Sequence, residues 1–263
     1  MQEHDLFEMC RQLHLSRTLA ERAMGLEAES HQEFLMKLFA AELSDRTVRR
    51  TENRLKTAGF YSMKTLNGFI KDDIQFPPGG GLDELMGLSF IKDKWNVVMY
   101  GGVGTGKTLL STAIGIEACK NDIPVRFYRT AALVNRLSEA KREGALTKVL
   151  SEIESAELLI FDEFGYVPID NTGAQLLFGI VSDCYEKKSI ILNTNLEFSH
   201  WVNILYDPKL TAALLARMLH HCHLLVFTGP DIRLKESSIN DMYTRIATDT
   251  VKNSVPGMKG DNK

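Results

Sequence analysis

Long hydrophobic runs, internal repeats and low-complexity segments are all missing from this sequence. No apolar run approaches the roughly 20 residues that a membrane-spanning helix needs. The N-terminus is polar and acidic, so it lacks the basic-then-apolar layout of a signal peptide. We therefore expect no membrane partner for this chain.

Cysteine is scarce, and charge of neither sign dominates. Cys10, Cys119, Cys184 and Cys222 are scattered without C-x-x-C spacing, which is typical of a reducing cytoplasm rather than of a disulfide framework. The 263 residues carry a net charge of −3 and are 44% hydrophobic, which indicates an ordinary globular chain. This balance leaves a nucleic-acid partner open, because a local basic face can bind phosphates.

What the sequence does contain is a glycine-rich stretch between two apolar segments. The run at 95–100 indicates a buried strand, and the spacing of apolar residues after the stretch predicts an amphipathic helix. The pattern G-x-x-x-x-G-K-T between them lets several backbone N–H groups face one anion, and the helix adds its dipole. The chain is therefore predicted to bind a nucleoside triphosphate. The predicted phosphate loop consists of Gly101, Gly102, Val103, Gly104, Thr105, Gly106, Lys107 and Thr108.

Four side chains have predicted chemical roles at this site. Lys107 is placed to reach the β- and γ-phosphates, and the Thr108 hydroxyl to ligate Mg²⁺. A later apolar strand ends in Asp162 and Glu163. Asp162 is predicted to hold Mg²⁺, and Glu163 to deprotonate an attacking water as general base. The pattern therefore indicates nucleotide hydrolysis.

Beyond residue 76 the chain alternates strands with helices. Further strands are predicted at 124–128, 158–163, 190–192 and 224–227. Such alternation predicts an α/β fold with a parallel sheet between helices and ligands at the carboxyl ends of the strands.

An asparagine after the strand at 190–192 is expected at the same edge of the sheet. We assign Asn195 to hold the water or sense the γ-phosphate, because it would lie at the tip of the adjacent strand. Asn193 is the competing candidate, since strand phase alone does not separate the two.

The first ~75 residues indicate successive helices. Ser44-Asp45 is expected to cap a basic helix whose arginines are spaced to share much of one face. Arginine forks suit phosphate oxygens and acidic residues are few here, so we interpret this face as DNA-binding rather than merely solvated. The predicted DNA-binding residues are Arg46, Arg49, Arg50, Arg54 and Lys56.

A proline- and glycine-rich segment at 75–81 breaks any helix and marks a domain boundary. We predict a small all-α N-terminal domain at 1–75, a nucleotide-binding domain at 76–240 and a flexible tail at 241–263.

Several stretches together resemble the IstB-like ATP-binding family. They are the phosphate loop, LLIFDEFGYVPID at 158–170, IILNTN at 190–195, and DPKLTAALLARMLHHC at 207–222 followed by Arg233. Members are AAA+ ATPases that assist a transposase in insertion-sequence transposition, and they are close relatives of DnaC helicase loaders. The resemblance covers about residues 30–240. It implies a five-stranded AAA+ P-loop core that uses ATP and Mg²⁺ in a bacterial cytoplasm.

The resemblance also implies roles for two arginines and a set of partners. Arg217 matches the position that acts as an arginine finger on a neighbouring subunit's γ-phosphate, a task suited to a permanent charge with forked donors. Arg233 matches a later arginine that senses nucleotide. The family implies a homo-oligomer that assembles with ATP on double-stranded DNA, largely without sequence preference, and selects a target site for its transposase.

Two other functions remain open at this point. A helicase loader would use the same ATPase core while its N-terminal helices grip a replicative helicase. A small-molecule kinase is disfavoured, because Glu163 directly after Asp162 suits activation of water rather than of a phosphoryl acceptor.

One histidine-rich stretch is not predicted to bind a metal. It comprises His220, His221, Cys222 and His223. Four consecutive residues cannot all face one ion, and no pair of ligands at zinc spacing lies elsewhere. Histidines here fit a helix end, where they favour the negative pole of the dipole.

Overall fold

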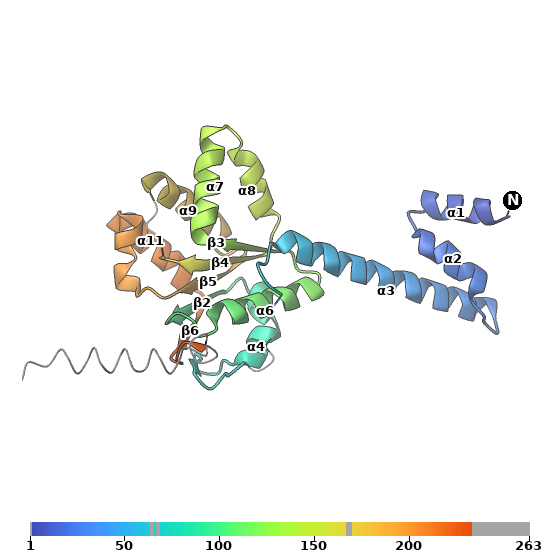
Figure 1. Cartoon of the computed structure of the whole chain (residues 1–263), viewed down its shortest axis with the longest axis horizontal. Coiled ribbons are helices and arrows are strands. Elements are labelled where there is room, and N and C mark those ends of the chain that lie inside the picture. Colours follow the sequence, from blue (N-terminus) through green and yellow to red (C-terminus); the bar gives the residue numbers. More distant parts are fainter. Residues whose placement is uncertain (1, 64–65, 67–68, 167–169, 233–263) are drawn as a thin grey trace, which may run out of the picture.

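The computed structural model describes residues 2–63, 66, 69–166 and 170–232. A sheet with helices on both faces forms the core, and one long helix joins it to a small group of N-terminal helices (Figure 1). The predicted α/β core and all-α N-terminal region are thus confirmed. The predicted tail at 241–263 and Arg233 lie outside the described residues.

Three helices make up the N-terminal region. They are α1 (Gln2–Gln12), α2 (Arg17–Gly25) and α3 (His31–Ala58). Their small core is made of the buried side chains of Cys10, Leu19, Ala20 and Leu38, with partly buried neighbours.

The predicted cap at Ser44-Asp45 is wrong, because both residues lie inside α3. The helix begins earlier, where the Ser30 side chain accepts a hydrogen bond from the Glu33 backbone N–H. No glycine or proline interrupts residues 31–58, so nothing in the sequence stops the helix before the left-handed Gly59.

The sheet has the strand order β1-β6-β2-β5-β4-β3. Strands β2 to β6 run parallel, as predicted, and β1 pairs antiparallel with β6 at one edge. The sequence could not reveal β1, because two residues are too few to show a period. The strands are β1 (Ile74–Gln75), β2 (Asn96–Gly101), β3 (Val125–Arg129), β4 (Leu158–Phe164), β5 (Ser189–Thr194) and β6 (Cys222–Phe227).

Helices cover both faces of the sheet because its strands are apolar on both sides. Val97 and Met99 of β2 pack with Ile114 of α6 on one face, whereas Val98 between them packs with Leu137 of α7 on the other. The helices of the core are α4 (Leu82–Met86), α5 (Ser89–Lys92), α6 (Lys107–Lys120), α7 (Thr130–Arg142), α8 (Leu146–Glu154), α9 (Asn171–Cys184), the 3₁₀ helix η1 (Phe198–His200), α10 (Val202–Leu205) and α11 (Pro208–Leu219).

The C-terminal end of α3 rests on β3. The guanidinium of Arg126 donates to the backbone oxygen of Thr57. The rings of Phe60 and Tyr61, just past the helix, meet Phe127 edge-on at 5.7 and 5.8 Å. The N-terminal helices are therefore attached to β3, the strand at one edge of the sheet.

All four cysteines lie within the described residues, and none forms a disulfide. Burial raises the pKa of the Cys119 and Cys184 thiols to about 11, so both stay protonated at neutral pH. Within the part of the chain that the structure describes, no helix has the length and hydrophobicity required to cross a membrane.

Candidate nucleotide-binding site

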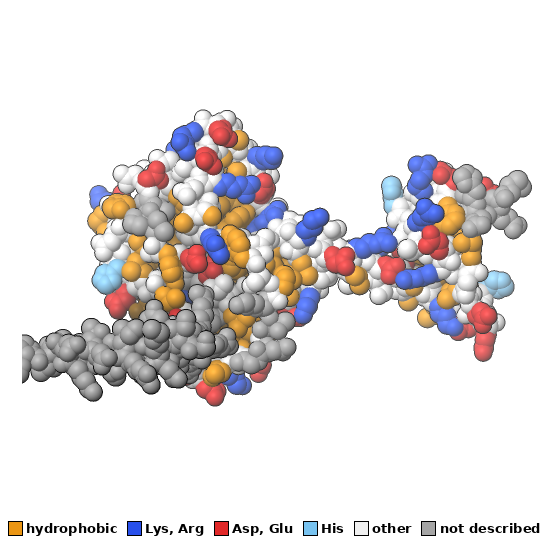
Figure 2. Space-filling model, viewed as in Figure 1, with side chains coloured by type: hydrophobic (Ala, Val, Ile, Leu, Met, Phe, Trp, Pro, Cys, Tyr) orange, Lys and Arg blue, Asp and Glu red, His pale blue; other side chains and the backbone are white. Residues whose placement is uncertain are grey.

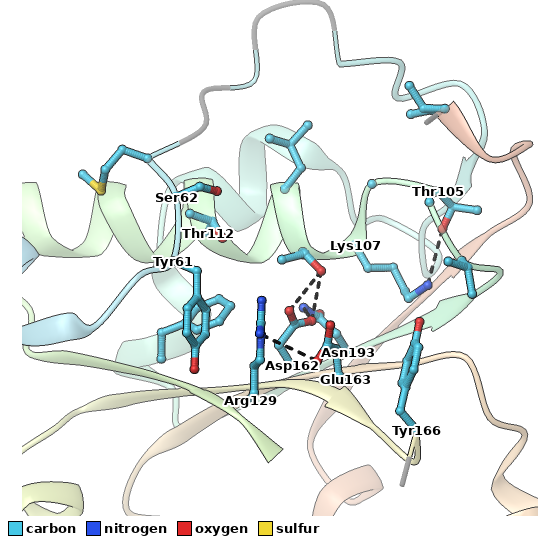
Figure 3. A pocket seen from close by; sticks show the side chains of 18 residues that line it. Tyr61, Ser62, Thr105, Lys107, Thr112, Arg129, Asp162, Glu163, Tyr166 and Asn193 are labelled. Atoms are coloured by element: carbon cyan, nitrogen blue, oxygen red, sulfur yellow. Dashed lines mark hydrogen bonds and ion pairs between the residues drawn. The ribbon is translucent and has the colours of Figure 1, made fainter. Parts of the chain in front are cut away.

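A cavity of about 640 Å³ opens at the carboxyl ends of β2, β3, β4 and β5. The phosphate loop forms one wall, the ends of β4 and β5 form the floor, and residues 61–63 close the side next to α3 (Figure 3). This volume lies in the range of small-molecule sites. The sheet thus brings together the predicted loop and the predicted carboxylates.

The loop conformation depends on its glycines. Gly104 and Gly106 have φ angles of 71° and 101°, a region that side chains disfavour. Gly106 is also the N-cap of α6 and provides no side chain for the N–H groups of the first turn. Those N–H groups and the helix dipole form an anion-binding site that faces the cavity.

Lys107 lies inside this loop and is only 7% exposed. Its ammonium donates to the backbone oxygens of Gly101 at 2.7 Å and Gly102 at 2.5 Å. A buried cation at the mouth of an anion-binding loop is the arrangement that polyphosphate recognition requires.

Thr108, Asp162 and Asn193 form a hydrogen-bonded group beside the loop, in which Thr108 is exposed and the other two residues are buried. The Thr108 hydroxyl donates to both carboxylate oxygens of Asp162 at 3.0 and 3.1 Å. The Asn193 amide donates to Asp162 Oδ1 at 2.9 Å and to Ser111 Oγ at 2.7 Å. Asp162 is 4% exposed and Asn193 is 1% exposed.

This group has the composition of a magnesium site. It presents a hydroxyl and a carboxylate, the oxygen ligands that Mg²⁺ prefers. The Asn193 side-chain oxygen is buried and has no hydrogen-bond partner among the described residues. An orphaned acceptor beside a carboxylate suits the hydrogens of metal-bound water, so the residues present fit Mg²⁺.

The structure places the two candidate asparagines differently. Asn193 lies within β5 and points at Asp162, as Figure 3 shows. Asn195 follows the strand, is exposed and does not line the cavity. The register of β5 against β4, which strand phase alone did not reveal, decides this difference.

Glu163 turns away from Asp162 because β4 has an irregularity between Phe161 and Phe164. Glu163 adopts a φ of +56°, a strained conformation for a residue other than glycine. Its side chain lines the cavity, and its carboxylate lies 3.7 Å from the Arg129 guanidinium. Asp162 is therefore buried in the floor of the cavity, whereas the next residue, Glu163, faces the open cavity.

Arg129 and Tyr61 are among the residues of the site that sequence reasoning missed. The Arg129 guanidinium lies 4.2 Å from the centre of the Tyr61 ring and also contacts Glu163 (Figure 3). Arg129 ends β3, and the rule that ligands bind at carboxyl ends of strands could have drawn attention to it. Tyr61 belongs to the predicted N-terminal domain, and nothing in the sequence indicates that it lies at the carboxyl ends of the strands.

Arg217 lies away from the cavity of its own chain. It occupies the last turn of α11, donates to the backbone oxygen of Ala213 at 2.9 Å and covers the Phe178 ring at 5.0 Å. Its side chain is partly exposed. The position is compatible with a role on another molecule.

The arginines predicted to bind DNA are exposed, apart from the partly buried Arg54, but they are hydrogen-bonded within the chain. Arg50 and Arg54 both contact Asp122, at 2.9 and 3.1 Å. Arg46 donates to Glu42 at 2.8 Å, and Arg49 approaches the Thr18 hydroxyl at 3.5 Å. Figure 2 shows acidic side chains interleaved with basic ones over this region, so it is not a uniformly positive face. Lys56 is exposed on the same helix.

With the phosphate loop, its carboxylates and the sheet order established, comparison with known proteins is decisive. A model of the IstB-like ATP-binding proteins matches residues 8–240. The chain belongs to the IstB-like ATP-binding protein family. It therefore has an AAA+ P-loop fold and binds ATP, as the resemblance implied.

Relatives within and beyond this IstB-like family agree with the assignment. The protein is 36% identical to one from Pseudomonas aeruginosa named as an ATP-binding protein of insertion sequence IS21, covering 88% of this chain and 87% of that one. It is 35% identical to one from Geobacillus stearothermophilus named for insertion sequence IS5376, covering 90% and 96%. The structure of AMPPCP-bound DnaA from Aquifex aeolicus shares the fold, with a TM-score of 0.50 and 19% identity over 75% of this chain and 62% of that one.

Proposed function

We propose that this IstB-like protein hydrolyses ATP to ADP and phosphate. The observation that carries the proposal is the hydrogen-bonded Thr108-Asp162-Asn193 group beside the Lys107 loop, with the Glu163 carboxylate facing the same cavity. Lys107 and the α6 N-terminus bind the phosphates. Glu163 accepts the proton of the attacking water, because it is the exposed carboxylate of the cavity.

Thr108 and Asp162 would hold Mg²⁺. When bound, this ion would neutralise part of the negative charge of the phosphates. Asn193 orients the Asp162 carboxylate through its amide, and its free oxygen can accept from a water of the site. We therefore assign to Asn193, rather than to Asn195, the role of holding the water or sensing the γ-phosphate.

The second part of the proposal is assembly on double-stranded DNA. Arg217 of one subunit completes the site of its neighbour, which is supported by its partly exposed position away from its own cavity. Many copies of α3 then align their arginines along the phosphates, which gives multivalent binding with little sequence preference. The relatives are named as ATP-binding proteins of insertion sequences, which supports a role in transposition, and the purpose that we propose for the assembly is target-site selection for a transposase.

The test is sedimentation of the protein with a duplex of arbitrary sequence, with ATP and Mg²⁺ or without nucleotide, at low and high salt. We expect a large complex only with ATP, and we expect salt to dissociate it because phosphate contacts release counterions. If the protein sediments as a small species and does not bind DNA in any condition, the proposal of assembly on DNA is wrong. A replicative helicase would then be the next partner to test.

A Glu163→Gln variant separates hydrolysis from assembly. It should bind ATP and DNA like the wild type but remain on DNA, because the proton acceptor is lost while the phosphate contacts stay. Glu157→Gln, a change at an exposed glutamate just before β4, serves as the control. Normal hydrolysis by Glu163→Gln would exclude Glu163 as the base.

A further inference from the structure

A cluster of potential metal ligands lies outside the nucleotide site. Glu186, His220 and His221 each offer one ligand atom, and these atoms all lie within 4.8 Å of one another. Glu186 follows α9, whereas the two histidines connect α11 to β6. Because β6 starts there, the cluster lies at the amino end of the strands, opposite to the edge that holds the phosphate loop.

The backbone under all three residues is fixed by hydrogen bonds. The His221 oxygen accepts from the Asn96 N–H at 2.7 Å, which ties the histidines to the start of β2. Glu186 has a φ of +57° in a tight turn, closed by Lys187 and Lys188 N–H groups that both reach the Cys184 oxygen at 2.9 Å. The ligands are therefore presented by rigid parts of the core, which favours a site with defined geometry.

The side chains already converge. His220 Nδ1 lies 4.0 Å from Glu186 Oε1 and 2.8 Å from the Tyr185 hydroxyl, which fixes the orientation of the ring. The His220 and His221 rings are 4.0 Å apart between centroids. A four-coordinate zinc ion needs its ligand atoms about 3.4 Å apart. Side-chain rotations that move these ligand atoms by about an ångström would bring them to that spacing.

The other two residues of the histidine-rich stretch face elsewhere. Cys222 begins β6, and its partly buried side chain packs against the hydrophobic core. The His223 ring packs on Trp95 at 5.0 Å, as the His221 ring does at 5.6 Å, but His223 does not belong to the group of converging ligand atoms. The stretch thus contributes two ligands, and the third comes from Glu186, which no spacing rule relates to them.

We propose that Glu186, His220 and His221 bind a divalent transition-metal ion of the zinc class, with a fourth position open to water. Two imidazoles and one carboxylate select such an ion over Mg²⁺ or Ca²⁺, which prefer sets of oxygen ligands. The ion ties the end of α9 to the α11–β6 junction. Arg217 contacts the same two elements, α11 through Ala213 and α9 through Phe178. Metal binding would therefore hold in place the two helices that Arg217 packs against.

The test is calorimetric titration of ZnCl₂ into untagged, chelator-treated full-length protein, with excess Mg²⁺ to occupy the nucleotide site. We expect one saturable site per chain. Glu186→Gln, His220→Ala and His221→Ala should each weaken binding by about tenfold or more, as loss of a ligand contact does. His223→Ala is the matched control and should bind zinc like the wild type.

Three outcomes overturn the proposal. Unchanged affinity in the three variants shows that zinc binds elsewhere, and equal weakening by His223→Ala shows diffuse binding to surface histidines. A second measurement guards against misfolded variants: zinc should raise the melting temperature of the wild type and of His223→Ala but not that of Glu186→Gln, whose change is isosteric and exposed. A zinc-dependent rise in Glu186→Gln equal to that of the wild type also rejects the site.

Discussion

Asp122 accepts hydrogen bonds from both Arg50 and Arg54, at 2.9 and 3.1 Å, so one carboxylate of the nucleotide-binding core holds two arginines of α3. Asp122 lies two residues beyond the end of α6, the helix whose first turn belongs to the phosphate loop. The two ends of α6 thus face the nucleotide and the arginine-bearing helix. Any polyanion that binds Arg50 and Arg54 must compete with Asp122.

Replacing Asp122 with asparagine should strengthen binding to duplex DNA. The change keeps the shape of the side chain but removes the charge that competes with phosphate, so we expect affinity to rise by about threefold to tenfold at low salt. Fluorescence anisotropy with a labelled duplex measures this. Glu117→Gln on α6, whose carboxylate pairs with Lys120, is the control. Unchanged affinity would place the DNA surface away from these arginines.

Removing the Arg129 side chain should change hydrolysis without changing ATP affinity. Arg129 holds the Glu163 carboxylate at 3.7 Å and is itself held by the Tyr61 ring, so its loss releases the proposed base. We expect Arg129→Ala to hydrolyse ATP severalfold faster in the absence of DNA. Steady-state phosphate release measures this, with Arg136→Ala, which breaks an exposed pair with Glu152, as the control. A slower rate would show that Arg129 supports catalysis rather than restraining Glu163.

The two asparagines of the β5 end should differ in importance. Asn193→Ala removes the amide that orients Asp162, and we expect kcat to fall by roughly 10- to 100-fold, as losses around metal ligands do. Asn195→Ala removes an exposed side chain outside the cavity and should leave kcat near the wild-type value. Measured rates in the opposite order would return the sensor role to Asn195.

The N-terminal helices should loosen in acid because of Glu42. Burial raises the pKa of this carboxyl group, but hydrogen bonds from Ser16 and Arg46 outweigh that effect, so its net pKa is lowered. A lowered pKa means that the stabilisation is present above the unfolded value near 4.5 and is lost as pH falls through the lower folded value.

Hydrogen exchange of the full chain measures this loosening. Amides of α2 should exchange faster near pH 4 than at pH 7, after correction for the intrinsic rate, while those of β4 stay protected. Glu42→Gln should produce the same loosening at pH 7, and Glu21→Gln, which breaks an exposed pair with Arg17, should not. Equal protection of α2 in wild type and Glu42→Gln would rule out this carboxylate as its anchor.

Local patterns were sufficient for the phosphate loop and the five parallel strands. Glycines at 104 and 106, followed by Lys107, leave few alternatives for the backbone, so spacing alone located the loop. The prediction of a helix start at Ser44 was wrong because a serine is also tolerated inside a long helix. Only the absence of a helix-breaking residue before Ser44 distinguishes a serine inside a helix from one at its start.

Contacts between distant segments were not predictable in the same way. The pairing of Arg54 with Asp122, the stacking of Tyr61 on Arg129 and the approach of Glu186 to His220 join residues from separate elements. The choice between Asn193 and Asn195 depended on the register of β5 against its neighbours. No periodicity within one segment contains that information.

The sequence by itself determined that this chain binds a nucleoside triphosphate in an α/β fold, because a phosphate loop is a local structure whose glycines, lysine and hydroxyl lie within eight consecutive residues. Only the tertiary structure decided which side chains surround the loop and hold one another. Sheet order and helix packing bring those side chains together across tens of residues, and their charges and hydrogen bonds act over a few ångströms, so their partners exist only once the chain is folded.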